Sequence, residues 1–423
     1  MKKIVLRLLC LCLAAVMCFG MFACGEQAAD PTTVGTTTGA TTEATTEVTT
    51  EATTEATTEA TVALNYNVIE SANKIKNIIL IIGDGMGLKH IDAGMFYDGI
   101  TYEFTNWPMV RVNTYPLADA NGTLSDDPTD SAASGTAMAT GVLTASGRLG
   151  NDFTNNQLPT IMDLANSMGK ATGVVVTDTL SGATPGGFSA HASYRDNVNE
   201  IIPSQMTSGV NLLCGFAQDN YTLIADQFKE HGYAFADKLG SVDSTFSSDY
   251  ALWQLDMYGV DATEPLEKVT PKALEYLSQD PDGFVVMIEQ AHIDKYSHSS
   301  DATKFENVCK SVSSLNKTVE AVMEWVGDRT DTLVLVTADH ETGGLQISEK
   351  AGKFEDEYVV GDNTLYYAFR GTNHTGANVA LYVYGVTADF TKSDLYFKSN
   401  GQKALKNTGI YHLMEEALLA GQE

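Results

Sequence analysis

The sequence contains little cysteine for its length, which excludes a fold organised by disulfide bonds. Only six of its 423 residues are cysteines. Four of them lie within the first 24 residues, so the rest of the chain holds only Cys214 and Cys309. Neither has the close spacing of a zinc finger, and a single disulfide bond and two buried thiols are equally compatible with the sequence.

Basic residues are also scarce. Lys and Arg number 26 against 54 Asp and Glu, which gives a formal net charge of -28. This charge excludes nucleic-acid binding by simple electrostatic attraction, because the protein would repel a polyanion. An anionic small substrate would therefore be attracted by bound cations rather than by the overall field of the protein.

The longest apolar run lies near the N-terminus and is too short for a membrane span. It spans residues 8–22, is preceded by the basic residues Lys2, Lys3 and Arg7, and is followed by Ala23-Cys24. This layout is typical of a secretory signal over residues 1–23. Residues 21–24 resemble a bacterial lipobox, so we expect a lipid on Cys24, with ordinary signal cleavage as the alternative. The expected location is the cell surface, lipid-anchored to the membrane, and the alternative is secreted or periplasmic.

Residues 24–62 are predicted to form a disordered stalk rich in Thr and Glu. Most of this region, residues 28–61, is built largely from Glu-Ala-Thr-Thr repeats and has almost no large apolar side chains. Such a segment cannot offset the entropy of ordering. Extended at ~3.1 Å per residue, it could hold a domain up to ~100 Å from an anchor. Glycosylation of its threonines is left open, and residues 63–423 are interpreted as one catalytic domain.

Apolar runs alternate with helical patterns in residues 63–423. Strands are predicted at 76–82, 171–176, 283–288, 332–336 and 379–384, and helices at 160–167, 221–230, 302–325 and 409–420. This alternation predicts an α/β fold with a mostly parallel central sheet flanked by helices on both faces, a three-layer sandwich. Residues 195–282 and 341–372 are more polar and are interpreted as excursions around the mouth of a site.

Three of the predicted strands end in residue types that bind metal ions. Residues 77–87 read NIILIIGDGMG, residues 283–298 read GFVVMIEQAHIDKYSH, and residues 332–340 read TLVLVTADH. In an open α/β sheet, the carboxyl ends of the strands form the edge where ligands bind. Buried acids without a counter-charge would be costly, so divalent cations are expected among them. The predicted polynuclear metal site comprises Asp84, Glu289, Asp294, His298, Asp339 and His340.

A candidate nucleophile lies between the first and second predicted strands. Residues 129–141 read TDSAASGTAMATG, and Asp130 and Ser131 are typical of a helix start. The small residues that follow would let this helix pack close to the sheet. A serine at a helix N-terminus that faces metal ions has both the helix dipole and a Lewis acid to stabilise its alkoxide. A capped, closely packed helix without chemistry is the alternative.

These motifs together resemble those of a known enzyme family. Asp-Ser-Ala-Ala-Ser-Gly at 130–135, Gly-Asp-Gly-Met-Gly at 83–87 and Thr-Ala-Asp-His at 337–340 are similar to sequences of bacterial and animal alkaline phosphatases. The resemblance covers about residues 76 to 384, in matching order. It implies hydrolysis of small-molecule phosphate monoesters through a phosphoserine, with two zinc ions and one magnesium ion. It leaves a homodimer open, since family members are often dimers.

The resemblance implies roles for individual residues. Ser131 matches the nucleophile, and Arg195 matches the arginine that binds phosphate, for which a guanidinium fork is well suited. Lys295 lies where a lysine can reach the phosphate through water, although a solvent-facing lysine is equally compatible. The implied ligands are Asp294, His298 and His374 for the first zinc, Asp84, Asp339 and His340 for the second zinc, and Asp84, Thr184 and Glu289 for magnesium.

The chain departs from the family two residues before Thr184. Family members usually have Asp or His there, and this chain has Gly182. The departure predicts weaker or water-rich magnesium binding, with Asp178 or Asp196 as candidate substitutes, and leaves the zinc pair unaffected. His292 lies among the implied ligands but matches none of them, so we expect it to be structural.

Two other functions stay open. Phosphodiesterases and sulfatases of the same superfamily share the zinc ligands, although sulfatases need a different nucleophile motif and diesterases commonly present Thr. Ser131 together with Arg195 favours the monoester, because the arginine meets its extra charged oxygen atoms. A non-catalytic binding protein on a Thr-rich stalk is the third hypothesis; such a protein would be free to lose ligands that this sequence retains.

Overall fold

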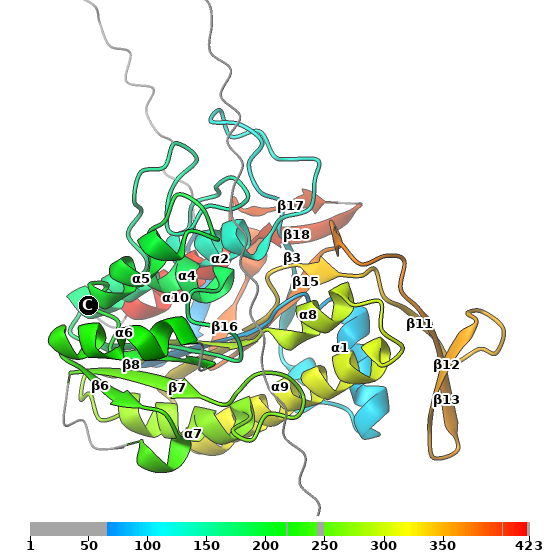
Figure 1. Cartoon of the computed structure of the whole chain (residues 1–423). Coiled ribbons are helices and arrows are strands. Elements are labelled where there is room, and N and C mark those ends of the chain that lie inside the picture. Colours follow the sequence, from blue (N-terminus) through cyan, green and yellow to red (C-terminus); the bar gives the residue numbers. More distant parts are fainter. Residues whose placement is uncertain (1–65, 217–218, 243–248, 400, 421–423) are drawn as a thin grey trace, which may run out of the picture. The chain divides into compact units, whose positions relative to one another are not determined.

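The computed structural model describes residues 66–216, 219–242, 249–399 and 401–420 (Figure 1). The predicted signal, Cys24 and the stalk lie outside the described residues, so these parts of the chain stay predictions. Within the described ranges, no helix is both long enough and apolar enough to cross a membrane.

An eleven-stranded sheet forms the centre of the described chain. Neighbouring strands are parallel from β9 through β6, whereas β15 runs antiparallel to both β9 and β3. From one edge to the other, the strands are β17 (Tyr396–Ser399), β18 (Gln402–Lys406), β3 (Met109–Asn113), β15 (Val379–Tyr384), β9 (Thr332–Thr337), β2 (Asn77–Gly83), β8 (Phe284–Gln290), β4 (Ala171–Val176), β5 (Leu212–Phe216), β7 (Tyr250–Leu255) and β6 (Tyr233–Ala236). The predicted mostly parallel sheet is confirmed.

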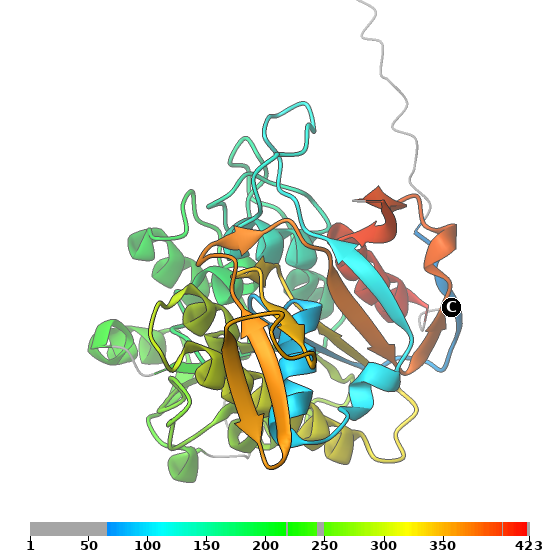
Figure 2. The ribbon, with the colours of Figure 1, turned by 90° about the vertical axis from the view of Figure 1, so that its right-hand side faces the viewer.

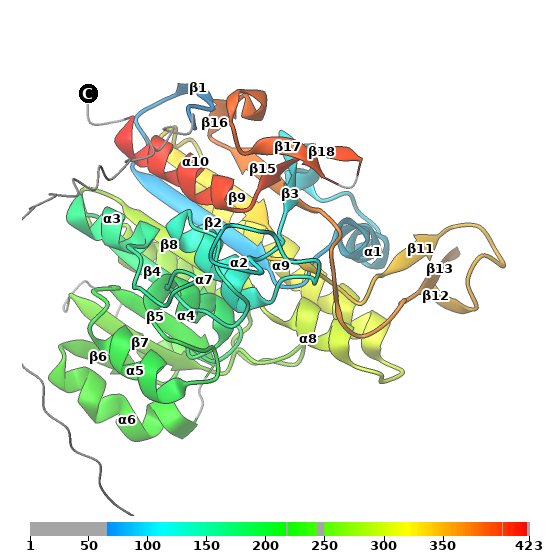
Figure 3. The same ribbon diagram turned by 90° about the horizontal axis from the view of Figure 1, so that it is seen from above.

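Helices cover both faces of this sheet (Figures 1 and 3). One face carries α7 (Leu266–Leu277) and α9 (Lys304–Val326), and α9 also contacts α1 (Leu88–Asp98) and α8 (His292–His298). The other face carries α2 (Ser131–Thr140), α3 (Ile161–Ser167), α4 (Ala183–Ser189) and α10 (Thr408–Leu419), with α5 (Val198–Met206) against α4; α6 (Asp219–Glu230) contacts β6 and β7. The three-layer α/β sandwich is therefore confirmed.

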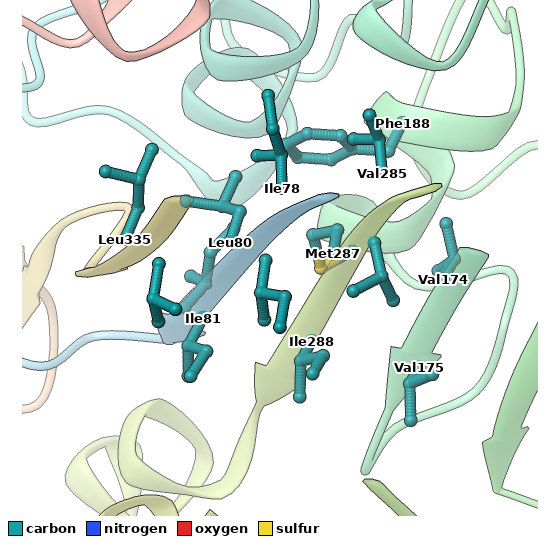
Figure 4. Packing of buried hydrophobic residues seen from close by; sticks show 14 of the residues in the cluster. Ile78, Leu80, Ile81, Val174, Val175, Phe188, Val285, Met287, Ile288 and Leu335 are labelled. Atoms are coloured by element: carbon teal, nitrogen blue, oxygen red, sulfur yellow. The ribbon is translucent and has the colours of Figure 1, made fainter. Parts of the chain in front are cut away.

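The central strands are buried because their sequences are almost wholly apolar. β2 reads NIILIIG, and all seven of its residues are buried. Figure 4 shows Leu80 of β2, Met287 of β8 and Leu335 of β9 in this core. Burying one such side chain contributes roughly 1.5–3 kcal/mol. This packing holds the carboxyl ends of three strands at fixed positions relative to one another.

The five predicted strands agree with β2, β4, β8, β9 and β15 to within two residues. The interpretation of residues 195–282 as an excursion was wrong, because β5, β7 and β6 in this region extend the main sheet at one edge. These strands read LLCGF, YALWQL and YAFA, and long polar segments separate them. Such short apolar runs carry too little periodicity to be distinguished from loops.

Residues 341–372 lie outside the main sheet, as predicted. Figure 2 shows their three-stranded antiparallel sheet in orange, in the order β11 (Gln346–Ser348), β13 (Asn363–Ala368) and β12 (Asp356–Val360). β10 (Glu341–Thr342) pairs with β14 (His374–Thr375), and β1 (Ile69–Ala72) pairs with β16 (Val386–Ala388). Short 3-10 helices span Glu103–Asn106, Leu239–Ser241 and Phe390–Lys392.

The two cysteines of the described chain are buried free thiols, which settles the alternative that the sequence left open. Cys214 lies on β5 and Cys309 on α9. Burial raises the pKa of both thiols far above the usual range. They are therefore inert core residues.

Candidate active site

Three adjacent strands bring acids to one edge of the sheet. In the pairing of β2 with its two neighbours, Ile82 lies opposite Glu289 of β8 and Thr337 of β9. Asp84 directly follows β2, and Asp339 lies two residues past β9. Carboxylates from three distant segments therefore meet where ligands bind in folds of this class.

The loop after β2 needs a glycine at position 85. Gly85 has a φ of 71°, in the left-handed region. A Cβ on this residue would lie 2.8 Å from Asp294 Cβ and 2.8 Å from Thr342 Oγ1. The absence of a side chain thus lets the loops after β2 and β8 approach closely enough to share one site.

Asp84, Asp339 and His340 form the first group of candidate ligands, with one ligand atom of each within 4.8 Å of the others. Asp339 Oδ1 accepts the backbone N–H groups of Gly85 at 3.0 Å and His340 at 2.9 Å. Asp339 Oδ2 and Asp84 Oδ1 are buried and accept no hydrogen bond from any described residue. Both face His340 Nε2, at 3.2 and 3.5 Å. Buried oxygen atoms without donors fit a bound cation.

Asp294, His298 and His374 form the second group. Asp294 Oδ1 lies 3.2 Å from Nε2 of His298 and 3.4 Å from Nε2 of His374. The four-residue spacing places Asp294 and His298 on one face of α8. His374 Nδ1 lies 2.7 Å from the carbonyl oxygen of Thr129, and His298 Nδ1 is bound to the carbonyl oxygen of Thr372. Since each Nδ1–H donates to a carbonyl, each Nε2 is available as a metal ligand.

The third group, which includes Asp84, adds Thr184 near the start of α4 and Glu289 near the end of β8. Thr184 Oγ1 and Glu289 Oε2 are buried, and in the described part of the chain neither has a hydrogen-bond partner outside this pair. Burial raises the pKa of Glu289 to about 8. The residues predicted for magnesium thus present unpaired oxygen atoms, and Gly182, which precedes α4, adds none.

The charges of the site are unbalanced without cations. Burial, together with the neighbouring carboxylates Asp339 and Asp294, raises the pKa of Asp84 well above its usual range. Burial also lowers the pKa of His340, which favours the neutral imidazole that binds metals. Divalent cations would offset the repulsion among these carboxylates.

Ser131 is the first residue of α2, and its Oγ lies 3.2 Å from His340 Nε2. The side chain of Asp130 caps the helix by accepting the N–H of Ala133 at 3.0 Å. Every residue of α2 is buried, and Ser134 Oγ donates to the carbonyl oxygen of Asp339 at 2.7 Å. The small residues of α2 therefore hold Ser131 Oγ against the first group of ligands.

Two cationic side chains near these groups are held by carboxylates. Arg195 Nη1 lies 3.1 Å from Asp130 Oδ2, which also accepts the N–H of Gly147 at 2.9 Å. Lys295 Nζ lies 2.9 Å from Asp178 Oδ2. Arg195 is thus bound to the residue before Ser131, and Lys295 follows the ligand candidate Asp294 in the chain.

The sequence does not predict that these two acids hold the cations. Asp130 is predicted only as part of a helix start, and its position next to the nucleophile is the one available signal. Asp178 is predicted only as a candidate substitute for the side chain that Gly182 lacks, not as the partner of Lys295. His292 is structural as expected, because its Nε2 accepts the N–H of Gly259 at 3.0 Å and its Nδ1 lies 3.1 Å from Thr177 Oγ1.

The chain matches the family model described as alkaline phosphatase over residues 75–214 and 253–370. These ranges contain Ser131, Arg195 and every ligand candidate except His374. Alkaline phosphatase 4 of Bacillus subtilis is 31% identical over 305 residues, which cover 66% of this chain and 64% of that protein. The chain thus spans slightly less than two thirds of this relative. Alkaline phosphatase of Escherichia coli is 26% identical over 422 residues, covering 78% of this chain and 86% of that protein.

Solved structures show the same fold. The alkaline phosphatase from the Antarctic bacterium TAB5 matches with a TM-score of 0.69 at 23% identity, and the match covers 82% of this chain and 99% of that one. A variant of the TAB5 enzyme has been solved with magnesium bound in a site designated M3.

Proposed function

Because this chain belongs to the alkaline phosphatase family, we propose that it hydrolyses phosphate monoesters to an alcohol and inorganic phosphate. The observation that carries the proposal is the position of Ser131, whose Oγ lies at the N-terminus of α2, 3.2 Å from His340 Nε2. A serine oxygen there can attack phosphorus, and the helix dipole favours its anionic form.

The ligand groups would hold three metal ions. Nε2 atoms and unpaired oxygen atoms that face one another support this assignment. When bound, such metals act as Lewis acids that stabilise the entering and leaving oxygen atoms of phosphoryl transfer. One zinc would be held by Asp294, His298 and His374, a second zinc by Asp84, Asp339 and His340, and magnesium by Asp84, Thr184 and Glu289.

The reaction would proceed by two displacements. Ser131 Oγ loses its proton and forms a bond to phosphorus while the bond from phosphorus to the alcohol oxygen breaks; this oxygen takes up a proton, and the products are the alcohol and a phosphoserine. The oxygen of a water molecule then loses a proton and bonds to this phosphorus, the bond to Ser131 Oγ breaks, Oγ takes up a proton, and inorganic phosphate leaves. Arg195 would pair with two nonbridging oxygen atoms in both steps, and Lys295 would reach the same phosphate through water.

The N-terminal motifs support a proposal about location. Residues 1–23 would direct export, and a lipid on Cys24 would hold the protein at the cell surface through the stalk. If the signal is simply cleaved, the protein would be secreted or periplasmic. Detergent-phase partitioning of the full-length protein tests this proposal, because only the lipidated form enters the detergent phase.

A phosphodiesterase of the same superfamily is the second candidate. The position of Arg195 favours the monoester, because this side chain is held next to Ser131 by Asp130 and would meet the extra charged oxygen atom that a diester lacks. A surface protein that only binds ligands is the third candidate.

Hydrolysis of p-nitrophenyl phosphate and of bis-p-nitrophenyl phosphate, measured side by side with zinc and magnesium present, distinguishes the three. We expect a strong monoester preference that is lost on chelation. Preference for the diester would move the chain to the other branch of the superfamily. Turnover of neither substrate by the metal-loaded protein would favour a binding protein.

A further inference from the structure

The side-chain space at position 182 is already filled by the loop that precedes α4. Gly182 has a φ of −59°, so the backbone conformation does not require glycine. A Cβ on this residue would lie 2.9 Å from the carbonyl oxygen of Thr179 and 3.3 Å from Asp178 Oδ2. Asp178 therefore supplies a carboxylate close to where a side chain of residue 182 would begin.

This carboxylate is paired with the lysine that follows a ligand candidate. Asp178 Oδ2 lies 2.9 Å from Lys295 Nζ, and the two side chains are 18% and 36% exposed. Both side chains are partly exposed, so water weakens the pair, although it is screened less than a fully exposed ion pair. The pair thus limits the positions that the Lys295 ammonium group can take.

The backbone on both sides of the pair is also fixed. The N–H of Phe216 donates to the carbonyl oxygen of Asp178 at 2.8 Å, and the N–H of Thr177 donates to the carbonyl oxygen of Glu289 at 3.1 Å. Asp178 is thereby held between β5 and β8, next to the strand that carries Glu289.

Thr177 ties the same loop to the start of α8. Its Oγ1 donates to Gln290 Oε1 at 3.0 Å, accepts the N–H of Ala291 at 2.9 Å and lies 3.1 Å from His292 Nδ1. The loop after β4 and the segment that leads to Lys295 are therefore one hydrogen-bonded unit. These hydrogen bonds keep the backbone segment that carries Asp178 next to the backbone segment that leads to Lys295.

The ion pair and the backbone hydrogen bonds together place the Asp178 carboxylate beside Lys295 and next to the strand that carries Glu289. Asp178 can thus act on both the third group of ligands and the candidate phosphate-binding lysine.

The other acid near position 182 in sequence does not share these contacts. Asp196 is exposed, and in the described ranges it forms no ion pair. Its charge acts on the neighbouring Arg195. Of the two candidate substitutes, the contacts favour Asp178.

We propose that Asp178 performs, from a different position in the chain, the task of the Asp or His that family members usually have at position 182. It is a positioning residue that orients Lys295 toward the substrate phosphate and adds negative charge next to the third metal site. Gly182 is then favoured because a side chain there would crowd both the carbonyl oxygen of Thr179 and the Asp178 carboxylate. This inference rests on the proposed function.

Calorimetric titration of the full-length, zinc-loaded protein with magnesium, and then with inorganic phosphate, tests the proposal without relying on turnover. Asp178→Asn keeps the shape of the side chain and removes its charge. We expect it to weaken magnesium binding about 10- to 100-fold, the usual cost of losing an outer-shell partner, and to weaken phosphate binding as well. The matched control, Asp196→Asn, should leave magnesium affinity unchanged.

Three further comparisons locate the effect. Gly182→Asp alone should not tighten magnesium binding, because its carboxylate would meet that of Asp178, whereas Asp178→Ala combined with Gly182→Asp should recover magnesium affinity relative to Asp178→Ala. Adding Lys295→Met to Asp178→Asn should weaken phosphate binding no further than Lys295→Met alone. If the combined exchange fails to fold, the Asp178→Asn titration decides.

Wild-type affinities for both magnesium and phosphate in Asp178→Asn would overturn the proposal. Turnover of p-nitrophenyl phosphate by the wild type tests the proposed function separately. If the wild type is active and Asp178→Asn binds magnesium and phosphate as tightly as the wild type, only the role of Asp178 is rejected. If the wild type is inactive, the proposed phosphatase function is rejected.

Discussion

Replacing Asp130 should separate the stability of α2 from the binding of phosphate. One carboxylate makes three contacts: it caps α2 through Ala133, accepts the N–H of Gly147, and pairs with Arg195. Asp130→Ala removes all three contacts. Asp130→Asn keeps an oxygen for the cap, since Asn is as good an N-cap as Asp, but removes the charge that holds Arg195.

The expected loss of stability follows from these contacts. Loss of an N-cap costs about 1 kcal/mol, and loss of the hydrogen bond from Gly147 costs about 1 kcal/mol more. The ion pair with Arg195 is partly exposed and adds at most about 1 kcal/mol. Asp130→Ala should therefore lower the free energy of unfolding by roughly 2–3 kcal/mol, and Asp130→Asn by less.

The effect on phosphate binding should be similar in both variants. Without its carboxylate partner, Arg195 samples more rotamers and must be ordered when phosphate binds. We expect the inhibition constant for inorganic phosphate to rise by about 3- to 10-fold, which corresponds to roughly 1 kcal/mol. Urea unfolding and phosphate inhibition of p-nitrophenyl phosphate hydrolysis measure the two quantities.

A matched control is available in α3, where Thr160 is the capping residue and accepts the N–H of Asp163 at 3.2 Å. Thr160→Ala should lower stability by about 1 kcal/mol and leave phosphate inhibition unchanged. The reasoning is refuted if Asp130→Ala is as stable as the wild type, or if its phosphate inhibition constant does not change.

Three other predictions concern the nucleophile, the acids and the thiols. Ser131→Ala should lower turnover by orders of magnitude while the metal content, measured by mass spectrometry, is unchanged; equal activity would reject the covalent route. In chelated protein, the pKa of Glu289 lies at about 8, against an ordinary value of 4.5. Its contribution to the free energy of unfolding is therefore fully present below pH 4.5 and is lost as the pH rises through about 8. The free energy of unfolding of chelated protein should fall across this window by up to about 1.4 kcal/mol per pH unit, and its melting temperature should fall with it. Metal-loaded protein should not show the fall; parallel profiles would contradict the metal assignment. Cys214 and Cys309 should react with a thiol reagent only after unfolding, because both thiols are buried, and rapid labelling of either of these two residues in the native protein, located by peptide mass mapping, would contradict the packing of β5 and α9.

Much of the fold could be predicted because the central strands are apolar on both faces. The runs that end at Asp84, Glu289 and Asp339 are long enough to be recognised, and parallel strands bring their carboxyl ends together. The strands β5, β7 and β6 at one end of the sheet could not be predicted, since their short apolar runs resemble loop segments.

The parts of the site that escaped prediction are contacts between side chains of distant segments. Arg195 and Asp130 are separated by a long stretch of chain, and the same is true of Lys295 and Asp178. No periodicity links such pairs, because loop geometry alone sets their distance. The carbonyl groups that orient His298 and His374 are backbone atoms, which any residue type provides.

The ligand groups draw on segments from residue 84 to residue 374, and the pairing of β10 with β14 brings His374 beside the loop after β9. We expect contacts between such distant positions to close late in folding, because the loop entropy of the whole chain opposes them. We therefore expect the complete cation sites to be absent from partly folded chains, and metals to bind only to the finished sheet. The rate of metal uptake after dilution from denaturant would thus report the last folding step of this protein, and a variant that slows closure of β10 on β14 would take up metal late even if its equilibrium affinity were normal.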